Sequence, residues 1–476
     1  MTAERFPAGL PDLADPADLF AVLYDRLTAD TLLFNREASS WADQQGFEDV
    51  AFWAERMAFG EGRVDLTRLR LTAPLRDSPG TLAILIGIDR ALACVNPRLG
   101  GVDTGALGYV LRRYARTGRF STGNVPGAVL PKLTQPARPE GQLTAADTFT
   151  SVVRVPDHSW RAVNHERADA RQDLPRLTRD LNVVVAPLLD SPRDIDITRI
   201  RGARRNISTG EAVDGYVLRP DDREEIRTRI RGILGRITEE KADIGVLPEA
   251  SLSAPLLAYW RDQLRRLSQD PDVGPRCCWI LVGTGPVGEP DPEGRYPNRA
   301  VVLDQFGEQV FSQDKTRDFS LTPKLIDDWE LSGPLGGTDL AVEWISRGDR
   351  IEVRESQAGR FAILICEDIT GSTWKSVLED CGVSHLLVPI FAAPLRGDWE
   401  FPRSDAQDYV RQAGSWVLAV NSLVTDSARE SYIGLLVGPC PTSRGEWGEA
   451  SLKFIEHSGP HRTGTVTLPT EVDAKG

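Results

Sequence analysis

Three side chains with reactive groups each follow a segment whose pattern predicts a β-strand: Glu249, Lys315 and Cys366. A carboxylate can accept the proton of a thiol, and a lysine ammonium can stabilise an oxyanion. The thiolate can then attack a carbonyl or nitrile carbon. Strands that are far apart in sequence can bring their ends to one edge of a sheet. The three residues together predict nucleophilic catalysis by a cysteine.

Cys366 stands directly after the apolar run 361–365, which is rich in branched residues and predicts a buried strand. Two acidic residues and a glycine follow closely. The strand therefore ends in a turn, where α/β proteins place catalytic groups. A single cysteine after an apolar run is more often an inert core residue. The assignment of a nucleophile thus depends on Glu249 and Lys315 as well as on this stretch.

The composition is that of an ordinary soluble protein. The chain has 476 residues, 41% of them hydrophobic and 26% charged, which suggests two or three domains. Its net charge of −13 argues against nucleic acid or an anionic membrane as a partner. The apolar run 82–88 is too short to span a bilayer, and no signal peptide is visible. We therefore expect a cytoplasmic protein.

The cysteines do not form a recognisable framework. There are six in the chain, with no CxxC pattern and no Cys/His cluster. This usage fits reduced thiols in a cytosol and predicts no structural metal site.

The elements that must position the reactive side chains differ along the chain. Residues 1–117 predict amphipathic and buried helices, beginning at Asp15-Pro16, which is a typical helix start. The segment 118–180 carries four prolines in its first half, so we expect a linker or an extended arm. From residue 181 strands and helices alternate, which predicts an α/β domain over 181–476.

An arginine-rich segment, 190–220, follows the first predicted strand of this domain. We expect a loop near the catalytic mouth, in which Arg204 and Arg205 favour an anionic group on the substrate. The alternative is a solvated loop without a function.

Taken in order, the reactive residues and their flanks resemble the nitrilase or carbon–nitrogen hydrolase superfamily. The matching stretches are Leu247-Pro-Glu249, Asn298-Arg-Ala-Val-Val-Leu-Asp304, Phe306-Gly307, Gln313-Asp-Lys315, Leu364-Ile-Cys366-Glu-Asp368 and Trp416-Val-Leu-Ala-Val-Asn421. The resemblance implies an α-β-β-α sandwich, here with an additional mostly helical N-terminal domain. It also implies a homo-oligomer that uses no metal and no organic cofactor.

The resemblance assigns a role to each residue. Cys366 would attack the substrate, Glu249 would act as general base, and Lys315 would stabilise the tetrahedral intermediate. The backbone N–H of Glu367 would help to hold the oxyanion. A thioester would form, ammonia or an amine would leave, and water would release the acid. The acidic pair after the cysteine resembles amidase and glutaminase-type branches, so we expect an amide or carbamoyl substrate and not a nitrile.

The superfamily usually places a second glutamate shortly after the lysine. The carboxylates that follow Lys315 are those of Asp318, Asp327, Asp328 and Glu330. The stretch 321–323 predicts a helix start, which would put Asp327 and Asp328 on different faces of that helix. We choose Asp327 as the second acid, which would orient Lys315 and keep it charged.

Two other functions are open at this point. A papain-like hydrolase needs a histidine base, and none of the five histidines is flanked like a catalytic partner. A nitrilase-fold protein with weak or lost catalysis could instead bind or regulate. The helical N-terminal domain and the altered second acid favour this reading, and the retention of Glu249, Lys315 and Cys366 argues against it.

Overall fold

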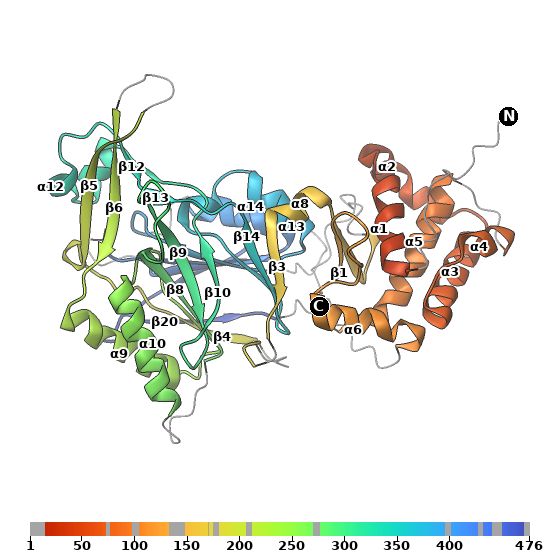
Figure 1. Ribbon diagram of the computed structural model, residues 1–476, viewed down its shortest axis with the longest axis horizontal. Helices are drawn as coiled ribbons and strands as arrows, with labels where there is room; N and C mark the ends of the chain where they lie inside the picture. Colours follow the sequence, from red (N-terminus) through yellow and green to blue (C-terminus); the bar gives the residue numbers. More distant parts are fainter. Residues whose placement is uncertain are drawn as a thin grey trace.

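Figure 1 shows the computed structural model of the chain, in which the N-terminal helices lie at one end and the sheets at the other. The structure describes residues 15–72, 77–97, 104–132, 148–169, 171–174, 180–205, 212–269, 277–395, 401–426, 432–439 and 450–470. Among these residues, no helix combines the length and apolarity that crossing a membrane requires.

The N-terminal part is helical, as predicted. Its helices are α1 (Pro16–Leu27), α2 (Thr31–Ala42), α3 (Phe47–Glu61), α4 (Leu66–Thr72), α5 (Asp77–Ala93), η1 (Gly105–Leu107) and α6 (Gly108–Thr117). The side chain of Asp15 caps α1 by accepting the backbone N–H groups of Ala17 and Asp18. Gly87 lets α5 approach α3 closely, because a Cβ at this position would lie 2.3 Å from the carbonyl oxygen of Ala51. These helices share a hydrophobic core of their own.

The segment that we expected to be a linker or an extended arm is built into the sheets. It contains β1 (Ala128–Pro131), β2 (Val152–Val155), α8 (Asp157–Ala162) and β3 (Val163–Arg167). Strand β1 pairs with β2, and β3 pairs in parallel with β14 (Ile351–Glu355). The segment therefore acts as an arm that completes a sheet and not as a free linker. The domain boundaries at 117 and 180 stay a prediction.

The first large sheet has the strand order β10-β9-β8-β7-β4-β20, with β13 paired to β9. Its strands are β4 (Leu181–Val185), β7 (Ile244–Val246), β8 (Trp279–Pro286), β9 (Tyr296–Leu303), β10 (Gln309–Asp314), β13 (Ile345–Ser346) and β20 (Gly464–Leu468).

The second large sheet has the order β19-β18-β17-β16-β15-β14-β3. Its remaining strands are β15 (Arg360–Ile363), β16 (His385–Ile390), β17 (Trp416–Asn421), β18 (Gly434–Gly438) and β19 (Ser451–Ile455). Strands β15, β16 and β17 run in parallel, so their carboxyl ends meet at one edge.

The two large sheets pack face to face between layers of helices. One hydrophobic core joins Val183 and Leu281 of the first sheet to Ile363 and Leu387 of the second. The outer face of the first sheet is covered by α9 (Glu224–Glu239) and α10 (Ala254–Ser268), and that of the second by α13 (Thr373–Asp380) and α14 (Arg403–Ala413). The predicted α-β-β-α sandwich with a helical N-terminal part is confirmed.

The prediction of an arginine-rich loop over 190–220 is wrong. The helix η2 (Pro192–Asp194) leads into a hairpin of β5 (Ile195–Arg205) and β6 (Ala212–Pro220). Alternate apolar residues of the hairpin, such as Ile197 and Leu218, are buried, and this alternation builds strands. The many arginines between them hid the pattern.

The hairpin belongs to a small sheet of order β11-β12-β6-β5. Its other members are β11 (Ser320–Leu321) and β12 (Ala341–Glu343), and between these two strands lie the helices α11 (Pro323–Asp328) and α12 (Ser332–Leu335). Strand β12 pairs in parallel with β6, which returns the chain to the vicinity of Lys315.

Candidate active site

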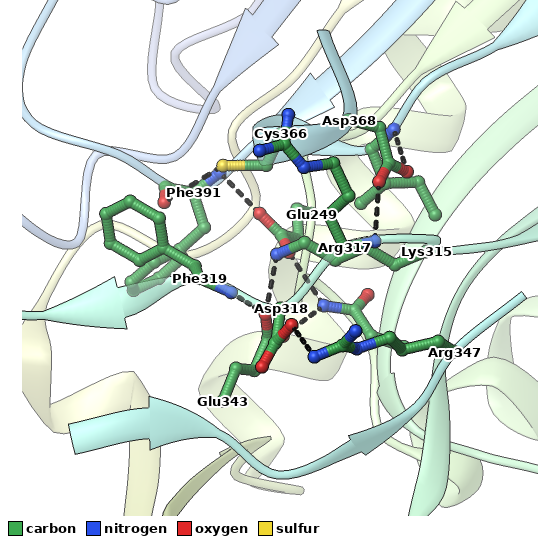
Figure 2. Close-up of polar contacts among 12 residues, drawn as sticks. Glu249, Lys315, Arg317, Asp318, Phe319, Glu343, Arg347, Cys366, Asp368 and Phe391 are labelled. Atoms are coloured by element: carbon green, nitrogen blue, oxygen red, sulfur yellow. Dashed lines mark hydrogen bonds and ion pairs between the residues drawn. The ribbon is translucent and has the colours of Figure 1, made fainter. Parts of the chain in front are cut away.

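The structure brings the three predicted catalytic residues together. Glu249 follows β7, Lys315 follows β10, and Cys366 follows β15 at the start of the short helix η3 (Cys366–Ile369). Figure 2 shows their side chains converging at one place. All three are 2% exposed or less, so their charges interact with little screening by water.

The ammonium group of Lys315 lies between two carboxylates. Its Nζ donates to Oε1 of Glu249 and to Oε2 of Glu343, each at 2.7 Å. Burial by itself would lower the pKa of Lys315, but the two carboxylates outweigh burial and hold the pKa well above its usual value. The lysine is therefore charged at neutral pH.

The second carboxylate that contacts Lys315 belongs to Glu343, whereas we had chosen Asp327 from the sequence. Asp327 is exposed on α11, whereas Glu343 is buried and reaches Lys315 from the end of β12. The backbone N–H of Phe319 also donates to Oε2 of Glu343, at 3.2 Å. Glu343 comes 28 residues after the lysine, so a spacing of one or two helical turns could not reveal it. The sequence did carry a signal, because the apolar stretch 340–342 directly precedes Glu343.

Cys366 forms a strained elbow. Its φ angle of 49° lies in the left-handed region, which side chains other than glycine rarely adopt, and such strain is concentrated at functional sites. The thiol contacts the carbonyl oxygen of Phe391 at 3.7 Å and is hydrogen-bonded to Glu249. Burial, followed by the charge of Glu249, raises the pKa of Cys366 well above its usual value. The resting group is a neutral thiol next to a base.

Glu249 is held at both carboxylate oxygens. Its Oε1 accepts from Lys315 and from Nδ2 of Asn298 at 2.7 Å each, and its Oε2 accepts the backbone N–H of Phe391 at 2.9 Å. Burial raises the pKa of Glu249 above its usual value, while Lys315 opposes this shift. A raised carboxylate pKa brings the group closer to that of an efficient general base at neutral pH.

Asp368 joins the elbow to the loop that carries Lys315. Its carboxylate accepts the backbone N–H groups of Ile365, Thr316 and Arg317 at 2.9–3.2 Å, and the hydroxyl of Thr316 at 2.8 Å. Burial raises the pKa of Asp368 to about 6. It is therefore ionised at neutral pH and aligns two segments that are distant in sequence.

The remaining predicted site residues have different positions. The backbone N–H of Glu367 lies in the first turn of η3, directly after Cys366. Arg204 forms an ion pair with Asp318, which also pairs with Arg347 beside the site. The side chain of Arg205 lies outside the described residues. Recognition of an anionic substrate group by Arg204 and Arg205 stays a prediction.

Two functional groups were missed by sequence reasoning, Glu343 and Asn298. Asn298 is a buried polar residue in strand β9, shortly before the apolar run 300–303, and this contrast was a signal in the sequence. Within the described ranges, no cluster of three or more His, Cys, Asp or Glu side chains could hold a metal ion.

Neither a protein-family model nor a curated protein sequence matches the chain. Several solved structures match part of the chain. An amidase from Nesterenkonia sp. is 14% identical, with 62% of this chain and 92% of that chain covered and a TM-score of 0.35. Nit3 of Saccharomyces cerevisiae, a member of branch 10 of the nitrilase superfamily, is 14% identical over the same shares, with a TM-score of 0.36. The C. elegans NitFhit protein is 12% identical, with 62% and 61% covered and a TM-score of 0.38.

Nit3 is described as a member of the superfamily that the sequence resembles. The TM-scores lie below 0.5, so the matches carry no argument about family or activity. The fold assignment rests on the layers and strand order described above.

Proposed function

We propose that this chain hydrolyses a non-peptide carbon–nitrogen bond of a small amide or carbamoyl substrate through a thioester on Cys366. One observation carries the proposal. A buried lysine ammonium lies between two glutamates, and one of these glutamates is hydrogen-bonded to a thiol on a strained elbow. A structural ion pair requires neither the thiol nor the strain.

In the first half of the reaction, Glu249 takes the thiol proton as Sγ of Cys366 bonds to the carbonyl carbon. The electron pair of the carbonyl bond moves to its oxygen, where the charge of Lys315 and the backbone N–H of Glu367 would stabilise it. When the tetrahedral intermediate collapses, the carbon–nitrogen bond breaks. The leaving nitrogen takes the proton from Glu249, and a thioester remains.

In the second half, water attacks the thioester and Glu249 accepts a water proton. Collapse of this intermediate breaks the carbon–sulfur bond and releases the acid. The thiolate of Cys366 then takes the proton back from Glu249. The site returns to its resting state with no net change in protons on the protein.

The second carboxylate supports this cycle. Each half-reaction protonates Glu249 for a time, and Lys315 then lacks one of its two negative partners. Glu343 still lies 2.7 Å from Nζ, so the lysine stays charged at the step where an oxyanion needs it. Self-association and a cytoplasmic location stay predictions from the resemblance and the composition.

The test measures ammonia release from a panel of amides, carbamoyl compounds and nitriles. We expect turnover of at least one amide or carbamoyl compound, and its complete loss in Cys366→Ala. Cys381→Ala is the matched control, because Cys381 is equally buried in the same core and burial raises its pKa to about 12. Full activity in Cys366→Ala would refute the mechanism. An inactive wild-type chain with an unreactive Cys366 would favour a binding or regulatory protein.

A further inference from the structure

Asn298 makes contacts that the reaction scheme above does not use. It lies on β9 and is 4% exposed. Its Nδ2 donates to Oε1 of Glu249 and to Oε1 of Glu343, both at 2.7 Å. The same two carboxylates accept from Lys315. Four side chains from four separate segments thus form a closed ring of hydrogen bonds.

We propose that Asn298 is a positioning residue, whose side-chain amide holds the carboxylates of Glu249 and Glu343 on either side of Lys315. This inference rests on the proposed function and names a further residue that acts through Glu249. An amide nitrogen has two N–H donors, and here one points to each carboxylate.

The orientation of the amide follows from its partners. If Oδ1 faced the carboxylates, acceptors would oppose acceptors, so Nδ2 must face them. Oδ1 is then left buried without a hydrogen-bond partner among the described residues. An unpaired buried acceptor is unfavourable. The amide retains this orientation because hydrogen bonds to two charged carboxylates are stronger than those to neutral groups.

The electrostatic consequence concerns the proton affinity of the base. The titratable groups around Glu249 are Lys315, Glu343, Cys366 and Tyr216. Two carboxylates that share one lysine repel each other, so one of them tends to take up a proton. The hydrogen bond from Asn298 opposes this tendency and lowers the pKa of Glu249. Without it, Glu249 would be protonated, and unable to act as a base, over a wider range of acidic pH.

The experiment follows alkylation of Cys366 by iodoacetamide in the full chain as a function of pH, with the modified peptide quantified by mass spectrometry. In Asn298→Leu, which removes both donors at similar volume, we expect the acid limb of the rate to move to higher pH by about one unit. Asn298→Asp preserves the shape but adds a third acid, so it should move the limb in the same direction. If the leucine variant does not fold, the Asn298→Asp variant provides the test.

The matched control is Asn182→Leu on β4, which removes a side-chain hydrogen bond to the carbonyl of Glu240 far from the ring. Its acid limb should coincide with that of the wild type. If the Asn298 variants are alkylated more slowly at every pH, and the acid limb of the pH–rate profile does not move, Asn298 has a merely structural role. This result would overturn this inference alone. A wild-type Cys366 that reacts no faster than Cys381 would overturn the proposed function together with it.

Discussion

Lys315 is almost completely buried and nevertheless charged, because two carboxylates lie 2.7 Å from its Nζ. A buried ion pair that loses one partner leaves an uncompensated charge. In the mechanism that we propose, Glu249 takes up a proton, and Glu343 then remains as the other carboxylate in contact with Lys315. At the scale of single residues, the two glutamates therefore have different roles although they contact the same ammonium group.

This difference predicts the effect of removing the second acid. Glu343→Gln should lower kcat by roughly 100-fold or more, because Lys315 would lose its lasting counter-charge where the oxyanion forms. Asp327→Asn should change kcat by less than about 2-fold, since Asp327 is exposed on α11. Steady-state kinetics on the best substrate of the panel checks both variants. A strong effect of Asp327→Asn with a mild one of Glu343→Gln would contradict our assignment.

At the scale of elements, the geometry of the site depends on how β15, η3 and the loop after β10 are joined. Cys366 gains its position from a backbone turn, and Lys315 from the end of another strand. The carboxylate of Asp368 accepts backbone N–H groups from both segments. The distance between nucleophile and lysine is therefore set largely by one side chain that contacts no substrate in our scheme.

Asp368→Asn tests this link. The amide would present a donor where the carboxylate accepts backbone N–H groups, so the elbow should shift relative to Lys315. A displacement of about 1 Å at a reacting group can cost roughly 100-fold in rate, and we expect a loss of that order in Cys366 alkylation at pH 7.5. The matched control is Asp380→Asn, where burial also raises the carboxylate pKa but the partner is Ser159. Equal rates in all three proteins would show that the elbow holds without Asp368.

At the scale of the whole molecule, a buried polar network joins the N-terminal part to the sandwich. Glu355 of β14 accepts from Nε of Arg360 at 2.6 Å and from the hydroxyl of Tyr114 at 3.1 Å. Arg360 also donates to the carbonyl of Pro131 at 2.9 Å. Since Arg360 begins β15, whose other end leads to Cys366, the N-terminal part supports the strand that carries the nucleophile. The catalytic groups that we propose all lie outside residues 1–180.

We therefore expect the N-terminal part to affect stability more than chemistry. Tyr114→Phe should reduce the free energy of unfolding by about 1.5–3 kcal/mol, because it removes a buried hydrogen bond to a carboxylate, and should leave the alkylation rate of Cys366 unchanged. Urea unfolding and iodoacetamide labelling measure the two quantities. Tyr259→Phe, which removes an exposed hydroxyl contact with Arg231, should change stability by less than about 0.5 kcal/mol. A Tyr114→Phe protein that keeps its full stability but loses the reactivity of Cys366 would contradict this division between stability and chemistry.

Local patterns in the sequence were sufficient for many of the elements, although not for the β5–β6 hairpin, and for several residues at their ends. The helix start at Asp15, the strand 416–421 and the elbow at Cys366 depend on neighbours within a few positions, so periodicity and turn residues predicted them. Glu249 and Lys315 were singled out for the same reason, since each lies shortly after the end of a strand.

Only the tertiary structure decided what lies beside these residues. Glu343 reaches Lys315 because β12 pairs with β6, and that pairing places Glu343 opposite Tyr216, which is distant in sequence. Asn298 acquires a role only when two carboxylates from other segments meet its amide. Spacing along a chain measures distance within a helix or strand, but it does not measure distance across a fold. The sequence by itself thus determined which thiol, carboxylate and ammonium group stand near strand ends, and the packing of strands placed a second carboxylate and its support beside Lys315.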